Sequence, residues 1–329
     1  MKWQILVPLC ALLGFHGIVS SRADEPSYGS LKGAALKEVL RPIPPKEPAE
    51  ALRSLEVIAG FSVEFVAHEP LVLDPVAAAI DEDGVMYVAE DADYPYKPRD
   101  GESPLGRIRV LKDNDGDGFY EESHLFAEGL LWPAGIAPWN GGIFVTAPPD
   151  IWYLKDTNGD FKADIKEKIY TGFGTGGSQY ILNNLQWGLD HKIYASVAGN
   201  GGQIRRADQQ NSISVSRKDF RFDPLTKEFE AISGGKQFGN TFDDWGNRFL
   251  CSQDTPVYQV VFPEKYLARN PFLSVSESTK WLVPGGDPVF RTSPIEGWRA
   301  VRSSRRLQAQ RALPSRVACP ITSWTALRG

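Results

Sequence analysis

Short apolar stretches separated by polar turns recur along the middle of the chain. An apolar stretch, a turn and a second apolar stretch follow one another in residues 77–89 (AAAIDEDGVMYVA), 134–146 (AGIAPWNGGIFVT), 185–196 (LQWGLDHKIYAS) and 241–251 (TFDDWGNRFLC). Each turn contains Asp, Asn or Gly, the residues that best tolerate the positive φ angles of a tight hairpin. The pattern therefore predicts four β-hairpins.

A second phrase recurs between these hairpins. Val110–Asp113 (VLKD) returns as Tyr153–Asp156 (YLKD), and more weakly as Phe220–Asp223 (FRFD). The hairpins and this phrase interleave in a unit of roughly 45–55 residues, which suits a four-stranded propeller blade. We predict an all-β fold, a β-propeller spanning residues 55–300 with about four recognisable blades. Since six or more blades are needed for a large closed ring, either later blades have diverged or the propeller is incomplete in this chain.

The beginning of the chain has the pattern of a secretory signal. Lys2 precedes a mostly apolar stretch at residues 5–19, and Ser21 and Ala23 are small residues at the positions that a signal peptidase inspects. We expect a signal peptide at residues 1–23 and export to the periplasm or the cell surface. An uncleaved membrane anchor is the weaker alternative, because the stretch is interrupted and shorter than the roughly 20 residues of a spanning helix.

The segments on either side of the expected propeller differ from it in composition. Residues 24–54 predict a linker with a short helix at 34–40, and residues 49–59 have the apolar spacing of a short amphipathic helix. Residues 301–329 contain six arginines and no acidic residue. This basic tail is either a disordered extension or the sign of an aberrant or truncated end.

Charge and cysteine content exclude two classes of protein. The formal net charge of −5 gives no electrostatic footprint for nucleic acid. Beyond residue 23 only Cys251 and Cys319 occur, too few for a disulfide framework. The fold must therefore be held together by its core.

Two turns have the oxygen spacing of calcium loops. Counting from the first Asp, oxygen-bearing side chains occupy positions 1, 3, 5 and 9 in both: Asp113, Asp115, Asp117 and Glu121 in the first, and Asp156, Asn158, Asp160 and Asp164 in the second. Alternate side chains can then converge on one hard cation, and glycine permits the bend. Ordinary turn chemistry is the alternative, since Asp, Asn and Gly are preferred in turns anyway. We expect calcium in at least one loop, in a stabilising role.

Several motifs between residues 172 and 271 support a family resemblance. They are GFGT at 172–175, NNLQWGLD at 183–190, FRFDP at 220–224, FDDWG at 242–246 and YLARNP at 266–271. In this order they resemble the membrane-bound dehydrogenase domain family of planctomycetes and verrucomicrobia, over roughly residues 55–306. That family is similar in fold to the soluble quinoprotein glucose and sorbosone dehydrogenases, six-bladed propellers that carry pyrroloquinoline quinone (PQQ) over the propeller axis.

The resemblance implies a site but leaves it incomplete. A histidine acts as general base in the quinoprotein enzymes, and the matching place here, near Gln179 and Tyr180, has none. The catalytic residue is therefore unknown. By their position in strands and loops around the axis, the expected cofactor or pocket residues are Gln179, Tyr180, Asn183, Asn184, Asn200, Gln237, Asn240 and Asp243. The alternative is that these side chains only cap strand ends. We expect Trp187 and Trp245 to pack between blades.

Three functional hypotheses remain open, and the dehydrogenase is the leading one. The resemblance implies an exported dehydrogenase that oxidises a sugar or alcohol with a bound quinone and passes electrons to an external acceptor such as a c-type cytochrome. No Cys-x-x-Cys-His motif occurs, so the chain itself is expected to carry no covalent haem. The missing histidine favours a non-catalytic, calcium-stabilised propeller that binds carbohydrate or protein. Lactonase or hydrolase chemistry would need an axial calcium, to which Glu90, Asn184 and Asp243 could offer oxygens.

Overall fold

The computed structural model describes residues 32–40, 44–253, 255–270, 272 and 277–282. The described residues up to 45 belong to a first compact unit, and those from 46 onward belong to a second. The described part of the first unit contains helix α1 (Gly33–Val39), where the sequence predicted a helix at 34–40. The expected signal peptide and the basic tail lie outside the described residues. No helix in the described part of the chain is long and apolar enough to span a membrane.

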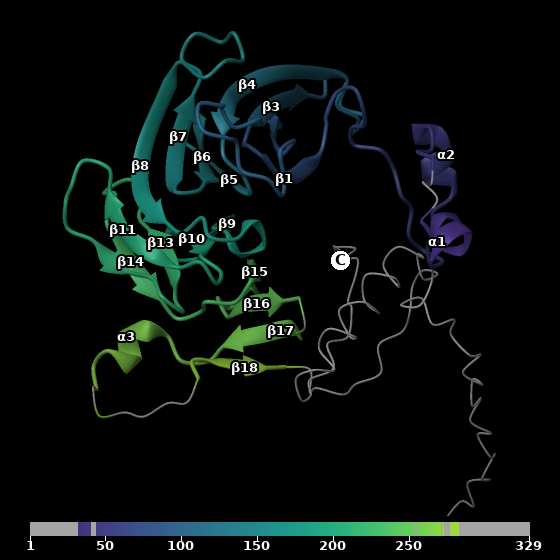
Figure 1. The fold of residues 1–329 in the computed structure, drawn as a ribbon. Helices are drawn as coiled ribbons and strands as arrows, with labels where there is room; N and C mark the ends of the chain where they lie inside the picture. The colour runs from purple at the N-terminus through teal and green to yellow at the C-terminus, as the bar shows by residue number, and fades with distance from the viewer. Residues whose placement is uncertain (1–31, 41–43, 254, 271, 273–276, 283–329) are drawn as a thin grey trace, which may run out of the picture. The chain divides into compact units, whose positions relative to one another are not determined.

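The second unit has an all-β fold of four antiparallel sheets, coloured from blue to yellow-green in Figure 1. The first sheet consists of β1 (Pro75–Ile80), β2 (Met86–Glu90), β3 (Gly106–Lys112) and β4 (Glu122–Leu130). The second consists of β5 (Gly135–Trp139), β6 (Gly142–Ala147), β7 (Asp150–Lys155) and β8 (Ile165–Phe173), extended by β11 (Gly202–Arg206) and β12 (Ile213–Ser214).

The third and fourth sheets repeat the four-stranded plan. The third consists of β9 (Asn183–Trp187), β10 (Ile193–Ser196), β13 (Asp219–Phe222) and β14 (Phe229–Ile232). The fourth consists of β15 (Phe238–Phe242), β16 (Arg248–Ser252), β17 (Thr255–Val260) and β18 (Thr279–Trp281). Three short helical segments, α2 (Pro48–Arg53), η2 (Ser178–Tyr180) and α3 (Glu264–Leu267), complete the second unit's described elements.

All four predicted hairpins are confirmed. They are the antiparallel pairs β1–β2, β5–β6, β9–β10 and β15–β16, the first two strands of each sheet. The turn of β5–β6 is Asn140–Gly141, with φ angles of 51° and 70°. Positive φ at both central residues matches the twist of the flanking strands, which explains the Asn-Gly pair. The recurring VLKD-type phrase ends the third strand of the first three sheets, β3, β7 and β13.

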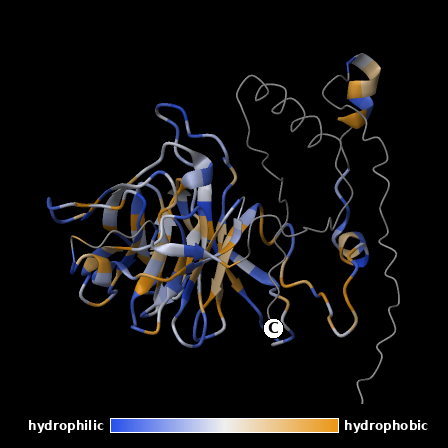
Figure 2. Cartoon of the chain, turned by 90° about the horizontal axis from the view of Figure 1, so that it is seen from below, coloured by the Kyte–Doolittle hydropathy of each residue, from blue (hydrophilic) through white to orange (hydrophobic). Residues whose placement is uncertain are grey.

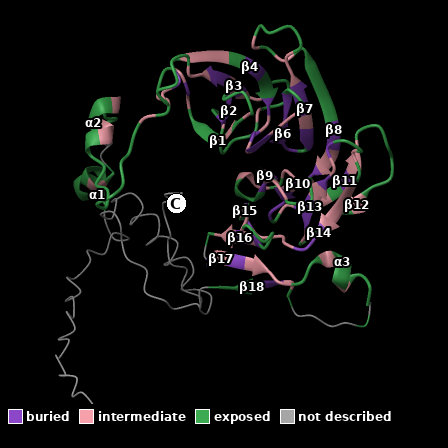
Figure 3. Cartoon of the chain, turned by 180° about the vertical axis from the view of Figure 1, so that it is seen from behind, coloured by how far each residue is buried: buried purple, intermediate pink, exposed green. Residues whose placement is uncertain are grey.

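Successive sheets pack through their first strands and share apolar cores. Strand β1 contacts β5, β5 contacts β9, and β9 contacts β15. Ile108, Phe126 and Ile143 belong to the core between the first and second sheets, and Phe144, Tyr170 and Phe222 to the core between the second and third. Burial is concentrated in middle strands such as β2, β3, β6 and β7, and the connecting loops are largely exposed and hydrophilic (Figures 2 and 3). Apolar burial between sheets therefore holds the first three sheets together.

The alternation of strand direction gives the sheets two distinct ends. We call the turn end the one that carries the hairpin turns 81–85, 140–141, 188–192 and 243–247, together with the third-to-fourth strand turns 113–121, 156–164 and 223–228. The polar end is the opposite one, where β1, β5, β9 and β15 begin. Contacts between neighbours keep the ends aligned: Asn184 N donates to Ala134 O at the polar end (3.1 Å), and His124 stacks on Phe161 at the turn end (ring centroids 4.7 Å).

Two expectations need correction, and one hairpin of the structure was not expected. The amphipathic helix expected at 49–59 ends at Arg53, because Ser54 caps it and Val57, Ile58 and Gly60 disfavour its continuation. The hairpin β11–β12, inserted between β10 and β13, pairs with β8 of the preceding sheet and was not predicted.

The second correction concerns Trp245, which was expected between blades. It lies in the β15–β16 turn with 84% of its surface exposed, because the turn projects it away from both sheets. Trp187, by contrast, packs against the core of the second and third sheets and donates from Nε1 to Pro138 O (3.3 Å).

Candidate functional site

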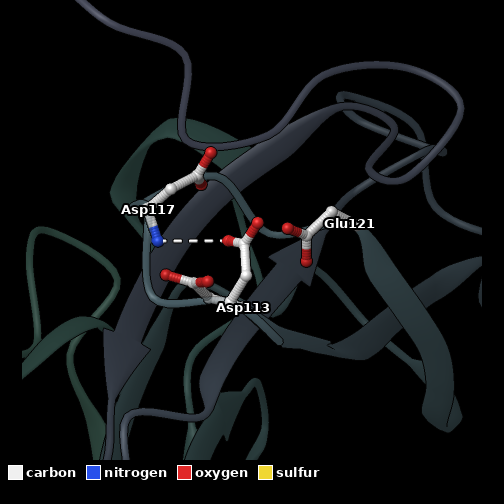
Figure 4. Close-up of side chains that lie close together, drawn as sticks. Asp113, Asp117 and Glu121 are labelled. Carbon is white, nitrogen blue, oxygen red and sulfur yellow. Dashed lines mark hydrogen bonds between the residues drawn. The ribbon is translucent and has the colours of Figure 1, made fainter.

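The loop 113–121 gathers four carboxylates at the turn end of the first sheet. Candidate ligand oxygens of Asp113, Asp115, Asp117 and Glu121 all lie within 4.8 Å of one another, and Figure 4 shows the labelled members around the bend. Gly118 N and Gly116 N donate to the two oxygens of Asp113 (2.9 and 2.6 Å). The Gly118 bond is the main reason that the pKa of Asp113 is lowered. Asp113 therefore favours its ionised form, and the other three carboxylates of the loop are exposed to solvent, as cation ligands should be.

The second loop, residues 156–164, is folded in the same way. Gly159 N and Phe161 N donate to the two oxygens of Asp156 (both 2.7 Å), in the places that Gly116 and Gly118 take in the first loop. Burial acts to raise the pKa of Asp156, but these donors and Asn158 N lower it overall. Asp164 Oδ2 accepts Thr157 N (2.7 Å), as Glu121 accepts Asn114 N in the first loop (3.1 Å).

The turn at residues 223–228 occupies the same place in the third sheet as the two acidic loops do in theirs, and it can be compared with them. Asp223 Oδ1 accepts Leu225 N and Thr226 N (2.8 and 3.1 Å), an ordinary Asx-type turn. Leu225 and Lys227 stand at positions 3 and 5, where the other two loops have Asp or Asn side chains. The same position in the sheet can thus turn with one Asp, so the additional oxygens of loops 113–121 and 156–164 exceed what turning requires.

A continuous set of contacts joins the two acidic loops. Phe161 of the second loop stacks on His124, whose Nε2 lies 2.6 Å from Glu122 Oε1. Glu122 in turn accepts Asn114 Nδ2 of the first loop (3.2 Å), and the His124 contact lowers the pKa of Glu122. His124, at position 12 of the first loop, therefore packs between the loops.

Seven of the eight expected pocket residues come together at the polar end. Asn183 Nδ2 donates to Gln237 O (3.1 Å), Gln237 Nε2 to Gln179 O (3.2 Å), and Asn240 Nδ2 to Asn184 O (3.4 Å). Asn200 N donates to Tyr180 O (3.2 Å). These amide side chains connect the backbones of the third and fourth sheets, which is a structural task whether or not a ligand also binds there.

Asp243 is the member of the set that lies elsewhere. It occupies the β15–β16 turn at the turn end, where Oδ1 accepts Asn247 N and Trp245 N (2.8 and 3.1 Å). Its hydrogen bonds to Asn247 lower its pKa. Asp243 therefore shapes its own hairpin at the end opposite the other seven residues.

The described histidines also avoid the polar end. His68 lies beside Phe119 of the first acidic loop, His124 lies between the two loops, and His191 is in the β9–β10 turn. Within the described part of the chain, no imidazole is placed beside Gln179 and Tyr180, where the resemblance would require a base.

The structure also contains a group of buried acids whose burial and pairing the sequence did not reveal. Glu90 is fully buried, pairs with Arg107 and Arg109, and accepts Leu73 N (2.6 Å), so its oxygens are committed to the sheet. Asp219 is fully buried and pairs with Arg248 across the third and fourth sheets. Asp91 is 8% exposed, and burial, with help from neighbouring Asp93, raises its pKa to about 7. Single acidic residues at strand ends give no periodic signal by which a sequence could reveal such pairing.

The comparisons with known proteins begin with a family model. The model described as "Domain of unknown function (DUF7133)" matches residues 47–321. No curated protein matches the chain.

Several solved structures are distantly similar. A luciferin-regenerating enzyme is 8% identical over 59% of this chain and 57% of its own, with a TM-score of 0.37. The PQQ domain of pyranose dehydrogenase from Coprinopsis cinerea is 14% identical over 55% of this chain and 45% of its own, with a TM-score of 0.35. A Trichoderma reesei carbohydrate-active enzyme of family AA12 is 16% identical over 41% and 36%, with a TM-score of 0.29. The chain thus spans less than two thirds of each, and these TM-scores do not identify a function.

Proposed function

The chain belongs to the DUF7133 family, and we propose that it is an exported β-propeller domain stabilised by calcium in the loop 113–121. The observation that carries the proposal is the convergence of four carboxylates within 4.8 Å in that loop. Hard oxygen ligands of this number and charge suit calcium, with water completing the coordination. The loop 156–164, with the same backbone fold, is proposed as a second and weaker site because an amide replaces one carboxylate.

The proposed propeller is of the six-bladed class, of which the described residues form four blades. Support comes from the four-stranded antiparallel plan of each sheet and from the packing of successive first strands against one another. The proposed role is to bind carbohydrate or protein, with the polar end as the face that bears the amide side chains.

Calcium is expected to raise the melting temperature of the full chain. At a calcium concentration about 100-fold above Kd, the rise should be about 5–10 °C over the protein in chelator, because calcium binds the folded chain and not the unfolded one. Asp113→Asn should remove most of this rise without changing the melting temperature in chelator by more than a few degrees. Differential scanning calorimetry with and without calcium measures both.

Asp223→Asn is the matched control, because Asp223 starts the equivalent turn of the third sheet without further ligands. It should leave the calcium-dependent rise intact. Equal calcium responses in the parent and in Asp113→Asn would overturn the assignment of the first loop.

A quinone-dependent dehydrogenase of sugars or alcohols, with an external acceptor such as a c-type cytochrome, is the second candidate. Its support is the resemblance of the motifs between residues 172 and 271. The residues at the polar end do not fit the quinone chemistry: the described histidines lie at the other end, and the acid with a pKa near neutrality, Asp91, is buried. We therefore derive no catalytic step through PQQ.

Calorimetric titration with PQQ, followed by a dye-reduction assay on mixed sugars and alcohols, tests this second candidate. We expect neither saturable PQQ binding nor substrate-dependent dye reduction by calcium-loaded protein. A stoichiometric PQQ complex that reduces dye would instead establish the dehydrogenase and make Gln179, Tyr180 and Asn183 the first residues to mutate.

A further inference from the structure

Asp91 stands apart from the other buried acids of the described chain. Glu90 has Arg107 and Arg109, Asp150 has Lys168 (2.8 Å), and Asp219 has Arg248. Asp91 is 8% exposed and pairs with no cationic side chain, and its Oδ1 accepts no hydrogen bond. The side-chain hydrogen bond of Asp91 is to another acid, Asp93, and burying two carboxylates together is costly, so this site calls for a positive charge that the described residues do not supply.

Two neighbouring acids add further negative charge around Asp91. Asp93 interacts with Asp91, and its Oδ1 is likewise buried without a partner. Asp74 lies close enough to repel the charge of Asp91, and its backbone oxygen accepts Asp91 N (3.2 Å). The group therefore contains two buried oxygens without donors, in an excess of negative charge.

The surrounding loop is held in a defined position. Leu105 N donates to Asp93 Oδ2 (3.0 Å), which ties the two ends of loop 91–105 together. Trp132 Nε1 donates to Tyr96 O (3.1 Å), and Lys97 Nζ to Thr175 Oγ1 (3.1 Å), which fix the loop to the segments before β5 and after β8. Asp91 and Asp93 are thus held in place before any ligand binds, which lowers the entropic cost of binding.

We propose that Asp91 and Asp93 bind a divalent cation of the calcium type at the polar end of the first sheet, with backbone oxygens and water completing its coordination. This site is separate from the proposed calcium loops, which lie at the turn end. A hard cation would neutralise both carboxylates and use the oxygens that have no partner.

The test uses the full chain with both acidic loops disabled by Asp113→Asn and Asp156→Asn. Isothermal titration with calcium should still show one bound ion per chain. Adding Asp91→Asn and Asp93→Asn should abolish this binding, whereas Asp100→Asn, an exposed acid in the same loop, should leave it unchanged. Each variant must melt cooperatively in chelator, which shows that it is folded. If the variant with both Asp91→Asn and Asp93→Asn does not fold, Asp93→Asn alone replaces it in the titration.

The outcomes separate this site from the loops. Failure of the loop-disabled chain to bind calcium, while it melts cooperatively, overturns the Asp91–Asp93 site and leaves the loop proposal standing. Calcium binding that survives Asp91→Asn and Asp93→Asn also overturns the site. Asp113→Asn and Asp156→Asn could leave calcium binding by the otherwise unchanged chain intact while Asp91→Asn abolishes it. That result would contradict the calcium loops and support the Asp91–Asp93 site.

Discussion

Replacing Asp219 by asparagine is expected to lower the free energy of unfolding by about 3–5 kcal/mol, because it leaves a buried guanidinium without its partner. Asp219 is fully buried; its carboxylate pairs with Arg248 of the fourth sheet and accepts Val197 N (3.1 Å). Burial raises the pKa of Asp219, and Arg248 opposes that rise. Asparagine keeps the shape of the side chain but not its charge. Urea denaturation of parent and variant gives the difference.

Asp208→Asn is the control for an exposed ion pair. Asp208 forms two hydrogen bonds with Arg206 (3.0 and 2.7 Å), but 63% of its side-chain surface is exposed. Water solvates both charges there, so no resolvable loss of stability is expected. A loss in Asp219→Asn no larger than in this control would show that the buried pair does not hold the third and fourth sheets together.

Replacing Phe222 by alanine is expected to cost about 3–5 kcal/mol, the range for deleting a buried aromatic ring. Phe222 is 1% exposed and lies 5.0 Å, centroid to centroid, from both Phe144 and Tyr170 of the second sheet. Alanine would leave a cavity at the centre of the core between these sheets and would remove both ring contacts. Chemical denaturation monitored by tryptophan fluorescence measures the loss.

Leu225→Ala provides the comparison for Phe222→Ala. Leu225 lies in the turn that follows β13 and is 79% exposed, so its truncation should change stability by less than about 0.5 kcal/mol. If Phe222→Ala cost less than about 1 kcal/mol, the cavity must collapse and the ring contacts would matter less than the geometry indicates.

The repeating part of the fold could be predicted because it depends on local pattern. Turn residues such as Asn140 and Gly141 determine the conformation of their own hairpin, and alternating apolar residues identify the strands that follow. The oxygen spacing of loop 113–121 is equally local, so the grouping of its four carboxylates was visible in the sequence. Each of these features involves residues that are close in the chain.

Features that join distant residues were not predictable in the same way. The pairing of β11 with β8 depends on where an inserted hairpin finds a free strand edge, and no pattern within the hairpin itself shows this. Nor does the sequence around Asp219 show that Arg248 lies beside it. Trp245 misled because an apolar ring suggests burial, whereas its place in a turn outweighs that preference. Asp243 lies at the turn end because it follows β15, and the sequence alone does not show in which direction β15 runs.

The different chemistry of successive sheet interfaces has a consequence for folding order. The apolar cores join the first three sheets, and none of these core clusters of the described chain includes a residue of β15–β18. The fourth sheet is attached instead by amide hydrogen bonds, the Asp219–Arg248 pair and the contact of Tyr194 with Phe242 (4.9 Å). Hydrogen bonds and ion pairs stabilise the folded chain only when both partners are already in position. The fourth sheet should therefore behave as a separate foldon, joining after the other three have formed and opening before they do.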